Sequence, residues 1–273
     1  MSDHQRGTGC IPDPPGLYRH FAAVHPAARK VPTMRLPDAA GPNAFAPPTQ
    51  DQDGIGECVG RGLSSALYTV LGSKGVPPRA PFSARACYNL ARAVDRASLC
   101  ASTEDLPPLE DGGCSPSQAA RAISKYGLAD ILDIDGGILD AQPELKNTEL
   151  KLGEYIACDA RRVTGLSWTS IPDDASDRLD QLVLALASGY PACVTVDASQ
   201  GEYQTYDGGE PLDCDGENWD HENYITYYKT DAAGARLFLL RNSWGKSWGD
   251  EGAAWVTEKF VRASSGLLIP RLP

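Results

Sequence analysis

The stretch "QDGIGECVGRG", Gln52–Gly62, decides how the chain is interpreted. Its glycines fit either a phosphate-binding loop ahead of a helix or the space around a nucleophilic Cys58. From the residue after Cys58, apolar side chains recur at i, i+4, i+7, i+8 and i+11 up to Val70, which predicts a helix with one apolar face. A helix that keeps Gly60 and Gly62, at about 1 kcal/mol each, predicts close packing at both positions.

The phosphate-loop interpretation fails on its context. A dinucleotide-binding loop follows a β-strand, whereas the preceding "PPTQDQ" does not have the pattern of a strand. Glu57 would also repel a pyrophosphate. The acidic run "DCDGENWD" at 213–220 has its glycine misplaced for an EF-hand, so we interpret it as a solvated loop. We therefore expect no metal and no cofactor, and we take Cys58 as the working residue.

Composition excludes several classes of protein. The chain has 273 residues, 42% hydrophobic and 22% charged, which is typical of a globular protein with a buried core. Its net charge of −11 repels phosphate backbones, so we expect no nucleic acid partner. No apolar run approaches the roughly 18 residues of a membrane span, and we see no signal peptide. The eight cysteines contain no C-x-x-C pair. We expect a cytoplasmic monomer with free thiols and no membrane association, and export by a non-classical route is the alternative.

The sequence pattern divides the chain into three parts. Residues 1–35 are rich in proline and predict an extended arm that packs over the body. Residues 36–150 predict further helices in "SARACYNLARAVD" and "SPSQAARAISKYG", the second capped by Ser115 or Ser117 and ended by Gly127. Residues 151–273 predict short strands at 161–168, 191–198, 223–229 and 236–242, with a helix at 177–187. Helices followed by strands predict an α+β fold with a helical and a β lobe.

Histidine gives the sharpest constraint on the site. Of the four histidines, three lie in the arm and only His221 lies in the body. If "HENYITYY" and "RLFLLRN" pair symmetrically about the turn, His221 lies opposite Asn242, with Cβ atoms about 4.5–5.5 Å apart. An amide oxygen would orient the imidazole without adding a charge.

Cys58 has the position of an activated nucleophile. At the first turn of a helix the positive end of the dipole lowers the pKa of a thiol, and a nearby imidazolium lowers it further. Gln52 can direct an amide N–H to the same place. With the backbone N–H of Cys58 it would form an oxyanion hole.

These elements resemble the papain-like cysteine peptidases, in particular a bacterial-like branch. The resemblance rests on Gln52 and Cys58, on Asp220-His221, and on the block "RNSWGKSWGDEGAAWV" that follows. It implies a helical lobe and an antiparallel β-barrel-like lobe with the active-site cleft between them. It also implies four catalytic roles: nucleophile for Cys58, general base for His221, orienting residue for Asn242 and oxyanion donor for Gln52.

The resemblance extends to residues around the reacting atoms. Trp244 matches the tryptophan that covers the Asn–His contact, and Gly56 matches the glycine beside the nucleophile. Gly112 and Gly113 match a ledge that offers backbone hydrogen bonds to an extended peptide. The implied function is hydrolysis of peptide bonds in a peptide or protein substrate through a thioester acyl-enzyme.

Two glutamates depart from the family pattern. Glu57 places a charge beside the thiol, which opposes a lowered pKa unless the side chain points to solvent. Glu222 stands where small residues are usual and could narrow the cleft or change specificity. Two alternatives remain open: an acyltransferase or amidase that uses the same thioester chemistry, and a catalytically silent binding protein that keeps the fold.

Overall fold

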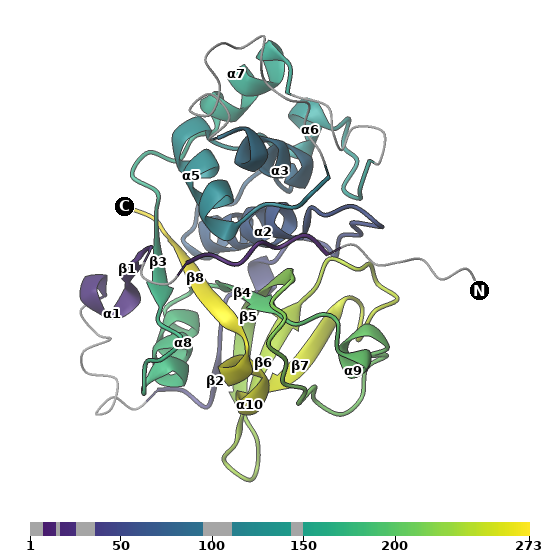
Figure 1. The fold of residues 1–273 in the computed structure, drawn as a ribbon. Coiled ribbons are helices and arrows are strands. Elements are labelled where there is room, and N and C mark those ends of the chain that lie inside the picture. The colour runs from purple at the N-terminus through teal and green to yellow at the C-terminus, as the bar shows by residue number, and fades with distance from the viewer. Residues whose placement is uncertain (1–7, 15–16, 26–35, 95–110, 143–149) are drawn as a thin grey trace.

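The computed structural model describes residues 8–14, 17–25, 36–94, 111–142 and 150–273. Helices gather above a sheet, and both layers come from one continuous chain (Figure 1). This confirms the predicted α+β class. The helical layer contains α2 (Cys58–Ser73), α3 (Ala84–Ala93), α5 (Pro116–Tyr126), α6 (Ile131–Ile134) and α7 (Leu152–Ala160). None of the described helices is long and apolar enough to cross a membrane.

The strands form one mixed sheet. Its order is β1 (Arg19–His20), β3 (Ser167–Ile171), β8 (Ser265–Arg271), β4 (Ala192–Val196), β5 (His221–Thr230), β6 (Arg236–Arg241) and β7 (Ala253–Thr257). The short β2 (Ala39–Ala40) also pairs with β5, and only β1–β3 is a parallel pair. In the described part of the chain the end strands β1 and β7 do not pair with each other. The expected β-barrel-like lobe is therefore an open sheet.

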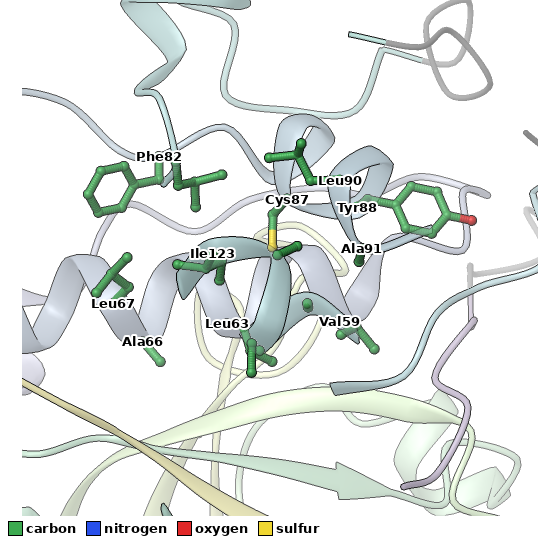
Figure 2. Close-up of a cluster of buried hydrophobic side chains, with 14 of the residues drawn as sticks. Val59, Leu63, Ala66, Leu67, Phe82, Cys87, Tyr88, Leu90, Ala91 and Ile123 are labelled. Atoms are coloured by element: carbon green, nitrogen blue, oxygen red, sulfur yellow. The ribbon is translucent and has the colours of Figure 1, made fainter. Parts of the chain in front are cut away.

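Helix α2 lies between the other helices and the sheet, and its glycines permit this. A Cβ atom on Gly60 would lie 2.7 Å from the Ala84 carbonyl oxygen of α3, and one on Gly62 would lie 2.9 Å from Cγ of Glu222 on β5. Both distances are too short for a side chain, so the predicted close packing is confirmed. The predicted apolar stripe is buried as well, and Figure 2 shows it meeting side chains of α3 and α5 in one apolar cluster.

Local signals in the sequence set several helix ends. Ser115 caps α5 in a capping box with Gln118, and Gly127 ends it at φ 76°, as predicted. Helix α8 (Arg178–Ala187) begins directly after Asp177 and packs against the sheet. The strand that we predicted at 161–168 is wrong for most of its length, because β3 begins only at Ser167. We also did not predict α7, α10 (Glu258–Ala263), β7 and β8.

The described part of the N-terminal arm is built into the body. After its first residues it contains β1, which pairs with β3, and α1 (Phe21–Val24). Phe21 is fully buried in the apolar cluster between the sheet and α8. Figure 1 shows the residues before β1 crossing between α2 and the strands. The arm therefore contributes both a strand and a core side chain.

Phe21→Ala is expected to lower the free energy of unfolding by about 3–5 kcal/mol, because it leaves a cavity in a closed core. The measurement is denaturant unfolding of the full chain. The matched control is Phe45→Ala, whose ring is 46% exposed and should cost much less. Equal losses for the two variants would show that the arm does not share the core.

Candidate active site

Cys58 is the first residue of α2 and is completely buried. Backbone N–H groups of Val59, Glu222 and Gly9 face its sulfur and favour the thiolate, but burial outweighs them and raises the pKa of Cys58 to about 12. We expected the pKa of the Cys58 thiol to be lowered, and this expectation is wrong for this structure, in which the thiol is buried. The contact with Glu222 brings the sulfur beside the residue that follows His221.

His221 begins β5 and is also fully buried. Its Nε2 lies 2.8 Å from Oδ1 of Asn242, and the same oxygen accepts the backbone N–H of Ser243 at 2.7 Å. Since this oxygen accepts, Nε2 carries the ring proton and Nδ1 keeps its lone pair. Nδ1 is buried without a hydrogen-bond partner among the described residues. Burial lowers the pKa of His221 to about 4, so the imidazole is neutral.

The strand register differs from the symmetric pairing that we predicted. Tyr224 pairs with Arg241, so the next position places Asn223 opposite Asn242, while His221 pairs with Val196 of β4. The turn is shifted toward the second strand, and a bulge interrupts the ladder between residues 225 and 227. His221 and Asn242 are instead diagonal neighbours on one face, and their side chains span that separation.

Aromatic rings enclose the imidazole. Trp244 lies over His221 with ring centroids 4.6 Å apart at 32°. Tyr203, on α9 (Gly201–Gln204), meets Trp244 edge to face at 5.3 Å and His221 at 6.2 Å. Its hydroxyl accepts the side-chain N–H of Asn223 at 2.8 Å. We missed Tyr203 in the sequence because a four-residue helix has no periodicity to detect.

Gln52 connects the loop before α2 with the loop after β6. Its backbone N–H donates to the Ser243 carbonyl at 2.9 Å, and its side-chain oxygen accepts the Ser243 hydroxyl. Its side-chain nitrogen donates to the Ile55 carbonyl at 2.8 Å. These bonds hold Gln52 beside the residue that follows Asn242. Its role as an oxyanion donor stays a prediction.

Arm residues 8–11 lie beside Cys58 and His221, the neighbours of Glu57 and Asp220. The N–H groups of Gly9 and Cys10 donate to the Asp220 carbonyl at 3.1 and 2.9 Å, next to His221. The Gly9 carbonyl accepts from Cys114, and Ile11 donates back to the Cys114 carbonyl, each at 3.0 Å. The Gly9 N–H also acts to lower the pKa of the fully buried Cys58 thiol, so this segment helps to cover Cys58.

The predicted glycine ledge lies partly under this segment. A Cβ atom on Gly9 would lie 2.4 Å from the Gly56 oxygen, and one on Gly113 would lie 2.1 Å from the Gly9 oxygen. Both glycines therefore allow close contact between backbones. The Gly113 N–H donates to the Tyr88 hydroxyl at 3.1 Å, and Gly112 has open space around it. The hydrogen bonds to the arm come from the next residue, Cys114.

Glu57 does not point to solvent, the condition that we set for a lowered thiol pKa. Its side chain is buried and accepts the Nε–H of Arg61, one helical turn later, at 2.9 Å. Arg61 also donates to the Gln50 side chain at 3.1 Å and to the Leu139 carbonyl at 3.0 Å. The charge beside Cys58 is thus neutralised within the protein.

Arg61→Met is expected to lower the free energy of unfolding by about 3–5 kcal/mol, because it leaves a buried carboxylate without its partner. Glu57→Gln in the same chain should recover much of that loss. Denaturant unfolding of the two single variants and the double variant measures the coupling. Additive losses would exclude a coupled buried pair.

Comparisons with known proteins agree with the resemblance. Residues 146–264 match the family model described as papain family cysteine protease. Cathepsin L of Sarcophaga peregrina is 34% identical over 92 residues, which are 33% of this chain and 26% of that protein. Cysteine protease 1 of Oryza sativa subsp. japonica is 34% identical over 133 residues, 48% of this chain and 26% of that protein. The matches thus span about a quarter of the length of these relatives.

Solved structures extend the likeness to the whole chain. Xylellain, a cysteine protease from Xylella fastidiosa, superposes with a TM-score of 0.72 at 19% identity, covering 98% of this chain and 97% of that one. The recombinant stem bromelain precursor gives a TM-score of 0.70 at 16% identity, covering 98% and 78%. At such identities the likeness shows the fold alone. The chain thus carries a papain-family domain match at residues 146–264 within the fold of the papain-like cysteine proteases.

Proposed function

We propose that the chain is a cysteine peptidase with Cys58 as nucleophile, His221 as base and Asn242 as orienting residue. The observation that carries the proposal is the 2.8 Å contact between His221 Nε2 and Asn242 Oδ1. It fixes the tautomer and leaves Nδ1 as the nitrogen that can take a proton. The sulfur of Cys58 lies at a helix start beside the backbone of Glu222, the residue after that imidazole.

The proposed reaction has two steps. His221 Nδ1 takes the thiol proton, and the sulfur attacks the peptide carbonyl carbon. The resulting oxyanion accepts hydrogen bonds from the Cys58 N–H and the Gln52 amide. The imidazolium then gives its proton to the leaving amine, and a thioester remains. Water, deprotonated by the same imidazole, hydrolyses the thioester and restores the thiol.

The arm holds this site in a latent state. Its backbone occupies the bonds that an extended peptide would need, at Cys114 and at the Asp220 carbonyl. It also keeps water from Cys58 and His221, so both groups stay neutral at pH 7. A thiolate–imidazolium pair requires the arm to move, because solvation of the charged groups removes the burial penalty.

Labelling with a thiol-reactive epoxide tests the nucleophile. We expect modification at Cys58, lost in Cys58→Ala and in His221→Ala and retained in Cys10→Ala. Asn242→Ala should reduce the rate less than His221→Ala, because a thiolate can form without the amide. Mass mapping identifies the modified residue. Modification of another cysteine, or of none, would overturn the assignment.

Gly9→Val tests the latent state in the full chain. A side chain at residue 9 collides with the Gly56 backbone, so the arm must leave the site. Since one pKa unit is tenfold in thiolate at neutral pH, we expect labelling of Cys58 at least about tenfold faster than in wild type. The control is Gly153→Val, at an exposed position with open space around it. Equal rates in all three proteins would exclude an inhibitory arm.

Incubation with a peptide library containing added amines tests the acceptor. Mass analysis should find hydrolysis products. Exclusive formation of amide products would assign the acyltransferase alternative instead, because the same thioester then reacts with the amine.

A further inference from the structure

Glu222 is a buried acid that the proposed reaction does not use. Its side chain is 1% exposed, and its Oε2 accepts the Thr195 hydroxyl at 2.7 Å. Its Oε1 is buried without a hydrogen-bond partner among the described residues. Within the described part of the chain no lysine or arginine pairs with it. The groups that act most on its charge are Thr195, Asp13 and Cys10, none of them cationic.

The carboxyl group contacts the segment that covers the active site. The Cys10 thiol lies 3.6 Å from Oε2 of Glu222 and 3.7 Å from the Thr195 hydroxyl. The neighbouring Gly9 is the residue that lies on the Cys58 sulfur. The arm therefore acts as a bound peptide whose side chain, one residue from the reacting atom, enters a subsite with Glu222 at its base. We call this the Glu222 subsite.

Space for a longer side chain lies beside Thr195, whose hydroxyl contacts Glu222. Thr195 also lines a cavity of about 500 Å³ between the arm, β3 and β8. Asp13 and Tyr18 of the arm form part of its wall, so the space widens once the arm leaves. Asp173 and Asp174 lie on the same wall. The cavity is thus lined by three acids, one histidine, and apolar and hydroxyl side chains.

A buried carboxyl without a cation is costly when ionised. In the covered state burial accordingly raises the pKa of Glu222 to about 8, so it is mostly protonated at pH 7. A guanidinium or ammonium entering the subsite would supply the missing partner and two or more donors for its oxygens. An apolar side chain would leave Oε1 unsatisfied, and a neutral polar one would donate hydrogen bonds without supplying a positive charge.

We propose that Glu222 selects substrates with an arginine or lysine side chain in the Glu222 subsite. This inference rests on the proposed peptidase function and adds the substrate class. The backbone of Glu222 faces the nucleophile while its side chain lies at the base of the subsite. The same residue therefore couples side-chain recognition to the position of the scissile bond.

The test uses the full chain carrying Gly9→Val, so that the arm does not occupy the subsite. Quenched fluorescent peptides, randomised on both sides of the scissile bond, identify the position that depends on Glu222. At that position arginine is compared with citrulline, its neutral isostere. We expect kcat/KM at least about tenfold higher for arginine, since citrulline cannot supply the charged partner of the buried carboxylate.

Glu222→Gln should abolish the difference between arginine and citrulline while it keeps the shape of the side chain. Glu222→Ala should shift the preference toward apolar side chains. The control Glu217→Gln removes an equal charge from an exposed position on the loop before β5 and should keep the preference. Thermal unfolding of each variant verifies folding. A preference for citrulline, no preference, or a preference that survives Glu222→Gln would overturn the proposal.

Binding of the same peptides to Cys58→Ser in the Gly9→Val chain is measured in parallel. Tighter binding of the arginine peptide supports the subsite even where no peptide is cleaved, and equal affinities overturn it. Absence of both cleavage and epoxide labelling would contradict the proposed peptidase function alone. The two failures are therefore distinguishable.

Discussion

The close approach of α2 to β5 is the constraint on which the site depends. Gly62 has no side chain, so the helix backbone lies against Glu222, and the Cys58 sulfur reaches the backbone of that same residue. His221 is its neighbour on the strand. Cys58 and His221 thus come from different layers, yet one contact sets the spacing of both. A side chain at Gly62 would separate the layers and, with them, these two residues.

Burial by the arm has opposite consequences for stability and for reactivity. The arm adds Phe21 to the core and backbone bonds at Cys114 and Asp220. The same contacts exclude water, which raises the pKa of Cys58 and lowers that of His221. Both shifts disfavour the charged pair that a thiol nucleophile needs at neutral pH. The segment that stabilises the molecule therefore also opposes formation of that charged pair.

The sequence was informative where the signal was local or periodic. The stripe after Cys58 and the capping residue Ser115 predicted their helices, because 3.6-residue periodicity and caps act within one element. The pairing of His221 with Asn242 was predicted for a wrong reason, since the turn lies nearer to the second strand than we assumed. The place of Tyr203 and the position of the arm over Cys58 could not be predicted. Their positions depend on contacts between segments more than a dozen residues apart, for which a single sequence carries no pattern.

The two glutamates that depart from the family pattern differ in how their charge is compensated. Glu57 has a cationic partner inside the protein, because Arg61 lies one turn away on the same helix. Its charge therefore belongs to the structure of α2. Glu222 has a hydroxyl, a thiol from the arm and one oxygen without a partner. A carboxyl that the fold leaves incompletely satisfied, at a subsite filled by a detachable segment, is suited to a partner from outside. We therefore infer that the charge of Glu57 stabilises the fold, whereas the carboxyl group of Glu222 binds a side chain of the substrate.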